Sequence, residues 1–486
     1  MISVGIWRVA VSAVVVSLSL TSVGAQESPP EEERPAVAEE VVGPAPGMAT
    51  VSLAQAVGLA LKKNYGLLSS ADSLQSSRIN YSAARAQFYP QLIPNYQRAS
   101  GQSSFGLEAT QRLPWTGGSL TASAALRTLP DTDLGVTRST GMQFVLRQPL
   151  LRGFGPNATH YGLRNSRRAQ ESQERSFELS RQRLAVDVSR SFYQIIQQRQ
   201  LLAVARQSLK RSENLLKASE ARLQVGLVSK LDVFRAELQA SQAQDAMVRS
   251  QAGLETALEQ FRVLLGLSPT EPLEPEVVEL GAELKDDAEP LETLLDRAIA
   301  RRLELQEGRD QIGDAQRSAS LARQNLLPQL DLNLGFTQGG LGTTFANAFN
   351  VDRRVNVFFS ASYPVERSSE RASKAVAEIE VAARSRGVRQ QELQIESEVR
   401  AALRELERIR KSVELQKKGV DVAEQQRRLA TLRYQRGLAS NFDVVDAEGS
   451  LVLARSALVN LLTSYQVARI ELMRVTGSLD VDAEFK

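Results

Sequence analysis

RLQVGLVSKLDVFRAE, residues 222–237, recurs almost unchanged as RYQRGLASNFDVVDAE, residues 433–448, so the two stretches start 211 residues apart. In each stretch a glycine (Gly226 or Gly437) follows a long helical pattern. Helices often end in a residue with left-handed backbone conformation, which glycine adopts with less strain than any other residue. A serine comes next and an aspartate follows it three residues later, which is the pattern of a capped helix start. The chain is therefore predicted to form the same sharp helical hairpin twice.

The repetition covers most of the chain, because other landmarks recur in the same order. Pro90 of FYPQL corresponds to Pro328 of LLPQL at an offset of 238, and Pro149 corresponds to Pro364 at an offset of 215. The first half therefore has 23 more residues than the second between its two prolines. Each half is expected to contain a short helix, a β region, a long helix, a tip turn and a second helix.

The predicted organisation is two repeats joined by an acidic linker. Its boundaries are a signal peptide at 1–25, a disordered Pro/Glu-rich segment at 26–50, a first repeat at 51–266 (β-hairpin region 91–149, long helix 157–225, tip turn 226–230, helix 231–265), a linker at 267–290, a second repeat at 291–477 (β-hairpin region 329–364, long helix 367–436, tip turn 437–441, helix 442–476) and a tail at 478–486.

The N-terminus has the pattern of a secretory signal. An apolar run from Val9 to Val23 follows Arg8 and ends in Val-Gly-Ala, a small-residue cleavage pattern before Gln26. The run is too short for a membrane-spanning helix, and no later stretch has 18 consecutive apolar residues. If this secreted chain enters a membrane, we expect it to do so as a closed β-barrel.

The composition excludes several classes of function. The chain has no cysteine, and His160 is its only histidine, so thiolate and histidine chemistry and most zinc sites lack their residues. The net charge is +3 with both signs interleaved along the helices, which does not suggest nucleic-acid binding. No phosphate-binding glycine loop occurs. We therefore expect neither an enzyme nor a bound metal or cofactor.

The long helices are predicted from apolar residues at seven-residue spacing, the seam of helices packed knobs-into-holes. Each would be ~100 Å long at ~1.5 Å per residue. The helices over 51–88 and 231–265 together match that length, so each long helix is expected to pack antiparallel to two shorter stacked helices. The seam residues are Val188, Ile195, Leu202, Leu209 and Leu216 in the first half, and Val399, Leu406, Val413 and Val420 in the second.

Strands are predicted from apolar and polar residues that alternate, most clearly over 330–337, 355–363 and 142–147. This alternation fits either a half-buried sheet or a membrane barrel. The two halves give four clear strands per chain, fewer than the roughly eight of the smallest membrane barrels, and three chains would give twelve. The extra segment 104–128 is predicted as an added hairpin with its turn at 115–118, either within the barrel or as an outside loop.

These features resemble the TolC-like outer-membrane efflux proteins, over about residues 51–480. The resemblance is carried by the duplication, the FYPQL and LLPQL helix ends, QPLLRGFG at 148–155, and the motif G-L-x-S-x-x-D-V-x-x-A-E after each long helix. The resemblance implies mainly α structure in which long antiparallel hairpins form a trimeric α-barrel in the periplasm. It also implies a shared 12-stranded β-barrel in outer-membrane lipid. The function it implies is a passive exit duct that docks to a periplasmic adaptor and an inner-membrane transporter.

The resemblance also implies a closing site at the tips. Tyr434, Asp232, Asp443 and Asp446 match family positions that close the aperture by hydrogen bonds and salt bridges. For Asp446 two interpretations stand: an acidic ring that attracts cations, or a solvated charge on a helix face.

Some relatives carry a basic residue two places after the second tip glycine, where this chain has Ala439, and Arg436 or Lys230 could replace it. The exposed tips are the expected adaptor contacts, because their residues are small or apolar: Gly226, Leu227, Val228, Ser229, Gly437, Leu438, Ala439 and Ser440.

One alternative is a periplasm-spanning structural or adhesin coiled coil without a pore, which predicts no amphipathic strands. Within the duct hypothesis the substrate stays open among drugs, metals and proteins.

Overall fold

The computed structural model describes residues 49–99, 102–131, 135–278, 280, 289–349 and 352–485. The predicted signal peptide and most of the predicted disordered segment lie outside these residues. Residues 49 and 50, predicted to be disordered, instead belong to a short strand that pairs with the linker between the repeats.

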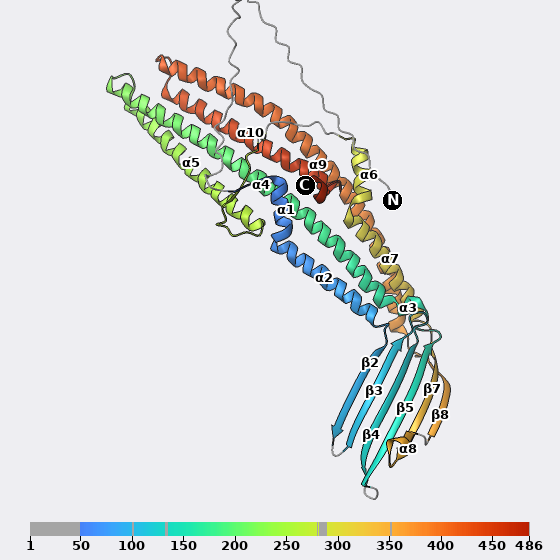
Figure 1. Ribbon diagram of the computed structural model, residues 1–486. Helices are drawn as coiled ribbons and strands as arrows, with labels where there is room; N and C mark the ends of the chain where they lie inside the picture. The colour runs from blue at the N-terminus through green and yellow to red at the C-terminus, as the bar shows by residue number, and fades with distance from the viewer. Residues whose placement is uncertain are drawn as a thin grey trace, which may run out of the picture. The chain divides into compact units, whose positions relative to one another are not determined.

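The two halves contain corresponding elements in the same order (Figure 1). The first half comprises β1 (Ala49–Val51), α1 (Leu53–Lys63), α2 (Tyr65–Ala86), β2 (Gln91–Ala99), β3 (Gln102–Arg112), β4 (Ser119–Asp131), β5 (Gly135–Pro149), α3 (Pro156–Thr159), α4 (Tyr161–Gln224), α5 (Lys230–Leu264) and β6 (Leu273–Pro275). The second comprises α6 (Leu291–Arg301), α7 (Leu303–Gln324), β7 (Gln329–Gly342), α8 (Phe345–Phe349), β8 (Asp352–Ser362), α9 (Ser368–Gln435), α10 (Asn441–Val475) and α11 (Val481–Glu484).

Two long helices organise the helical part. α4 has 64 residues and α9 has 68. α4 packs against α2 and α5, and α9 packs against α7 and α10. The seven-residue seam lies in these contacts, since Val188, Ile195, Val399 and Val413 are fully or almost fully buried. α10 also packs along α4, so towards the tips the helices form a row in the order α5, α4, α10, α9.

α10 is the one described helix that is long and apolar enough to cross a membrane by length and composition alone. It packs along α9 and α4, and Val444, Ala447, Leu451 and Val459 are buried there. Its apolar composition is therefore explained by packing between the two halves.

The shorter helices stack end to end at a glycine. Gly266, just after α5, has φ +77, and a Cβ at this position would lie 2.2 Å from the carbonyl oxygen of Lys63. The backbone end of α5 therefore fits against the junction of α1 and α2, where the Asn64 amide donates to the Leu264 carbonyl at 2.8 Å. Asn64 also caps α2, so the single helix predicted over 51–88 is two helices with a bend between them.

The linker is fixed partly by a buried ion pair. Its strand β6 pairs in parallel with β1. Arg199 of α4 forms an ion pair with Glu274, and it donates to the Pro275 carbonyl at 2.8 Å. Both charged side chains are almost fully buried, and burial lowers the pKa of Arg199. If the linker moved away from α4, both charges would lose their partner, which is costly for buried charges. The ion pair therefore holds the linker against α4.

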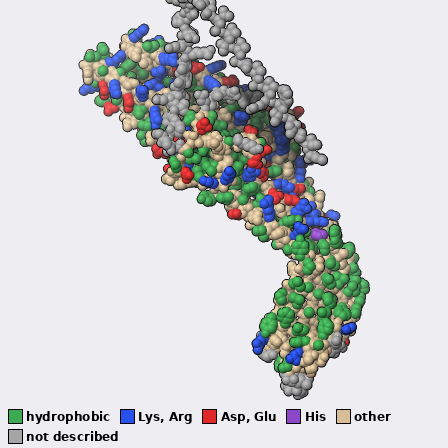
Figure 2. Space-filling view, viewed as in Figure 1, with side chains coloured by type: hydrophobic (Ala, Val, Ile, Leu, Met, Phe, Trp, Pro, Cys, Tyr) green, Lys and Arg blue, Asp and Glu red, His purple; other side chains and the backbone are tan. Residues whose placement is uncertain are grey.

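The β region is one antiparallel sheet in the order β2-β3-β4-β5-β7-β8. The prediction of four strands per chain was wrong, because this sheet has six. The 104–128 segment forms a hairpin, as predicted, and the hairpin lies within the sheet. Hydrophobic side chains gather over this sheet, whereas charged side chains lie mainly over the helices (Figure 2).

Candidate functional site

Both helical hairpins turn at a glycine-based helix end. Gly226 has φ +76 and Gly437 has φ +75. At the first tip the Gly226 N–H donates to Leu223 O and the Leu227 N–H to Arg222 O, both at 2.9 Å. The second tip has the same two bonds at 3.0 and 2.8 Å, from residues 211 positions later. These bonds satisfy carbonyls at the helix end and fix the direction of the turn.

The helix after each turn starts with a capping box. The Ser229 hydroxyl accepts from the Asp232 N–H at 3.2 Å, and the Asp232 carboxylate accepts from the Ser229 N–H at 3.1 Å. Ser440 and Asp443 form the equivalent bonds at 3.4 and 2.8 Å. The hydrogen bond from Ser440 lowers the pKa of Asp443. Within the chain, two of the four predicted aperture residues are therefore bound to their own helix starts.

Substitution of Gly437 by valine is expected to distort the second tip. A Cβ there would meet no atom within 4 Å, so the strain comes from the backbone alone. The left-handed conformation costs a non-glycine residue roughly 1–2 kcal/mol, and a β-branched residue adopts it least readily. Hydrogen exchange at the tip should be faster in Gly437→Val, and export should fall. Gly437→Asn is the control, since asparagine tolerates this conformation; equal exchange in both variants would contradict the assignment.

The two hairpins are joined near their tips by Tyr434 and Arg222. The Tyr434 side chain is buried, and its hydroxyl lies 3.0 Å from the Ser219 hydroxyl of α4. Arg222 of α4 donates to Tyr434 O at 2.7 Å and to Gln435 O at 2.9 Å. Its guanidinium carbon also lies 4.4 Å from the centre of the Tyr434 ring. One arginine thus holds the end of α9 by two charge-assisted hydrogen bonds and a cation–π contact.

Two more contacts join the hairpins beside this one. The Asn441 amide of α10 donates to Asp232 O at 2.7 Å, and Asn441 is almost fully buried. Further from the tip, Arg211 of α4 pairs with the nearly buried Glu448 of α10 at 2.7 Å. We call these contacts, together with those of Arg222 and Tyr434, the hairpin clamp.

A cavity of 230 Å³ lies within the hairpin clamp. Its walls include Arg211, Arg222 and Arg427, with Glu448 as the one carboxylate among them. The pKa of Arg427 is lowered, mainly by burial and to a smaller extent by repulsion from Arg211. The Nε atom of Arg427 is buried and has no hydrogen-bond partner among the described residues. Positive charge therefore exceeds negative charge behind the tips.

The structure separates the predicted aperture residues. Tyr434 is buried in the hairpin clamp, whereas Asp446 is exposed on α10 and its side chain forms no hydrogen bond or ion pair with another described residue. Arg436 and Lys230, the predicted substitutes for the basic residue missing at Ala439, are both exposed. In the predicted adaptor contacts the two leucines are strongly exposed, Leu227 by 73% and Leu438 by 74%, whereas Val228 and Ala439 are partly buried.

Sequence reasoning missed Arg222, Ser219 and Asn441. One signal for the first was present: an arginine stands four residues before each tip glycine, as Arg222 and Arg433. Nothing local distinguishes the one that clamps from the other, because the contact depends on how the two hairpins meet.

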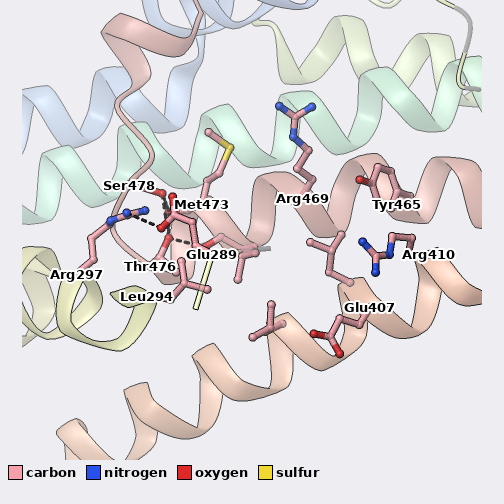
Figure 3. A pocket seen from close by; sticks show the side chains of 13 residues that line it. Glu289, Leu294, Arg297, Glu407, Arg410, Tyr465, Arg469, Met473, Thr476 and Ser478 are labelled. Carbon is pink, nitrogen blue, oxygen red and sulfur yellow. Dashed lines mark hydrogen bonds and ion pairs between the residues drawn. The ribbon is translucent and has the colours of Figure 1, made fainter. Parts of the chain in front are cut away.

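A groove of 520 Å³ lies away from the tips, between α6, α9 and α10 (Figure 3). Two of its polar side chains have partners within the chain: Glu289 pairs with Arg297 at 2.6 Å, and the Thr476 hydroxyl donates to Leu472 O at 2.8 Å. Leucines form much of the remaining wall, Leu294, Leu403, Leu406 and Leu472. Nothing in this groove resembles a nucleophile paired with a base.

Comparison with known proteins identifies the family. Residues 56–267 and 294–478 match the family model of outer membrane efflux proteins. The chain belongs to this family. The resemblance to TolC-like proteins drawn from the sequence is thereby confirmed.

Relatives match over nearly the whole chain. Outer membrane efflux protein BepC of Brucella suis is 24% identical over 454 residues, which cover 90% of this chain and 88% of BepC. The solved outer membrane protein VceC of Vibrio cholerae is 15% identical, with a TM-score of 0.68 and coverage of 87% of this chain and 96% of VceC. The outer membrane channel MtrE of Neisseria gonorrhoeae, solved in an open state, is 16% identical, with a TM-score of 0.64 and coverage of 94% and 98%. The two solved structures show a shared fold.

Family membership gives the location and the general role. The chain is an efflux channel protein of the outer membrane that extends into the periplasm. Members of the family are channels, and the described residues contain no group of three or more His, Cys, Asp or Glu that could hold a metal ion.

Proposed function

We propose that three copies of the chain form the exit duct of a tripartite efflux or type I secretion system. The duct conducts substrates passively through the periplasm and the outer membrane. Its tips dock to a periplasmic adaptor, and an inner-membrane transporter supplies the energy. The observation that carries the proposal is a pair of unpartnered apolar stripes at the two free edges of the helix row.

The first stripe lies on α9, which ends the row. Leu415, Val422 and Leu429 are exposed by 69%, 63% and 51% and are spaced seven residues apart. This is the spacing of a coiled-coil seam, yet none of the described helices covers these side chains. Large exposed apolar side chains in a regular line mark a protein contact.

The second stripe lies on α5, at the opposite edge of the row. Leu231, Phe234, Leu238 and Val248 are all more than half exposed, and at 3.6 residues per turn their spacings of three, four and ten residues place them on one helix face. Phe234 is 8 residues after Gly226, and Leu429 is 8 residues before Gly437. Since the hairpins have equivalent tips, α9 of one copy can pack against α5 of the next with apolar residues at matching heights.

Contacts of this kind are head-to-tail, and they form a closed ring when the rotation between copies closes. The sheet also has two free edges, β2 and β8, whose residues are exposed along both strands. Exposed strand edges in lipid would leave backbone groups unsatisfied, so pairing of β2 with β8 of the next copy is favoured. The free edges of the helix row and of the sheet therefore both support a closed ring of copies.

The tips then surround the periplasmic mouth of the duct. We place the closed state in the hairpin clamp, where Arg222 and Tyr434 hold the second hairpin against the first. Docking of the adaptor on the exposed leucines of the tips would move the second hairpin away and open the mouth. Asp232 and Asp443 contribute by capping the helices that start at the tips.

Asp446 is expected to give the mouth a preference for cations. Its exposed carboxylate would recur once in each copy, and a threefold ring of carboxylates attracts cations. In Asp446→Asn the ratio of cation to anion permeability, measured from reversal potentials in a salt gradient, should fall. Asp421→Asn on α9 is the control for an exposed carboxylate further from the tip. An unchanged ratio in Asp446→Asn would assign Asp446 to the solvated helix surface.

Solute release from vesicles tests the proposed function. Purified Arg222→Ala protein, in which the contacts that hold the mouth closed are removed, should release a trapped small hydrophilic dye from lipid vesicles, and the same protein unfolded by heat should not. Vesicles that stay sealed with the folded variant present would favour the coiled coil without a pore.

A further inference from the structure

The hairpin β3–β4 has no counterpart among the described strands of the second half, where only the short helix α8 separates β7 from β8. It is nevertheless an integral part of the sheet. β3 pairs with β2 from Gln102 to Thr110, and β4 pairs with β5 over its whole length. Strand order places the hairpin between β2 and β5, the strands that correspond to β7 and β8.

The hairpin follows the same division of faces as the other strands. Residues directly opposite in an antiparallel pair point to the same face of the sheet. One row of such pairs crosses all six strands and is apolar throughout: Leu92, Ala109, Ala122, Phe144, Phe336 and Val355. Within the hairpin, Phe105, Leu107, Leu120 and Leu126 lie on this face, each exposed by 40–51%.

The opposite face is polar in the hairpin as well. In the row one residue further along, Ile93 of β2 is apolar and the five residues on the other strands are polar: Glu108, Ser123, Gln143, Thr337 and Arg354. On this face Arg147 of β5 pairs with Asp331 of β7 at 2.7 Å. A hairpin surrounded by water on both faces would not need one apolar face and one polar face aligned with those of the neighbouring strands. The alignment therefore favours a hairpin that is part of the barrel wall.

We propose that β3–β4 is embedded in the outer membrane and contacts acyl chains through its apolar face, so that three copies close an 18-stranded barrel. This inference rests on the proposed three-copy duct, since three six-stranded sheets give eighteen strands. β3 has 11 residues and β4 has 13, enough to span a bilayer, which takes roughly 9–11 residues in a tilted strand. Barrel diameter grows about linearly with strand number, so the exit should be about 1.5 times as wide as a 12-stranded one.

Spin labels on single cysteines test this inference, because the chain has no cysteine of its own. Leu107→Cys and Leu126→Cys report the apolar face of the hairpin, and Glu108→Cys and Ser123→Cys report the polar face. Leu334→Cys and Asn333→Cys on β7 are the matched pair outside the hairpin. The full-length protein is labelled and reconstituted into lipid vesicles, and each label is probed with oxygen, which concentrates in lipid, and with a water-soluble nickel chelate.

Labels at 107 and 126 should be relaxed mainly by oxygen, and labels at 108 and 123 mainly by the nickel chelate, in phase with 334 and 333. If all four hairpin labels are open to the nickel chelate while 333 and 334 still differ, the hairpin is an outside loop and the inference fails, although the duct stands. If 333 and 334 do not differ either, the proposed membrane barrel fails and the inference fails with it.

Discussion

Replacement of both Val422 and Leu429 by glutamate is expected to yield monomers without channel activity. Both side chains lie in the α9 stripe that we assign to the contact with α5 of the next copy. A trimer would bury six carboxylates, two at each of three contacts, opposite Phe234 and its apolar neighbours. An unpaired buried charge costs several kcal/mol, so the total exceeds what the contact is expected to supply. Native mass spectrometry of the purified variant measures the loss of the trimer directly.

A positive charge introduced into the α5 stripe tests the proposed contact between α9 and α5 of the next copy most strictly. Phe234→Lys introduced together with Leu429→Glu should restore part of the trimer that Leu429→Glu alone loses, because the two residues are at the same height from their tips. A coupling of this kind, measured by a double-mutant cycle, requires direct proximity. Leu453→Glu is the matched control: Leu453 is 73% exposed on α10, in the middle of the helix row. Trimers of undiminished stability in Val422→Glu/Leu429→Glu would contradict the assembly.

Substitution of Arg222 by alanine is expected to open the periplasmic mouth. It removes two hydrogen bonds to the end of α9 and the contact with the Tyr434 ring. Hydrogen bonds from a charged donor contribute about 1.5–3 kcal/mol each, less where water reaches the group. A loss of about 2 kcal/mol changes the ratio of closed to open states by roughly 30-fold. Mean single-channel conductance should therefore rise several-fold.

Arg436→Ala is the control for this substitution. Arg436 has the same charge and lies at the same tip, but its side chain is exposed and joins no part of the hairpin clamp. Ser219→Ala should have a smaller effect of the same sign, because it removes only the partner of the Tyr434 hydroxyl. Unchanged conductance in Arg222→Ala with normal trimer mass would place the closing contact elsewhere, for example between copies.

The features that could be predicted from the sequence are those encoded by short-range spacing. Seven-residue apolar spacing predicted the long helices, and α4 and α9 contain the buried seam residues. The glycine and serine of each tip determine the turn by local backbone bonds, so the motif alone was sufficient. The duplicated motif also indicated the family, which the match over residues 56–267 and 294–478 shows.

The features that could not be predicted depend on long-range contacts. Whether β3 and β4 join the sheet is decided by pairing with β2 and β5, and their small residues, such as Ser123 and Ala124, alternate weakly in hydropathy. The break at Asn64 depends on the arrival of the end of α5, 200 residues later. Arg222 and Tyr434 likewise meet only when two hairpins pack, so neither sequence copy reveals the hairpin clamp.

Single-channel recording of the purified mature protein in planar bilayers, with the mass of the same sample determined by native mass spectrometry, tests the central claim most directly. The account predicts a trimer with small, cation-selective openings, because the hairpin clamp keeps the mouth narrow and Asp446 lines it. Conductance should then rise in Arg222→Ala. A folded protein of another stoichiometry that forms no channel would contradict the duct.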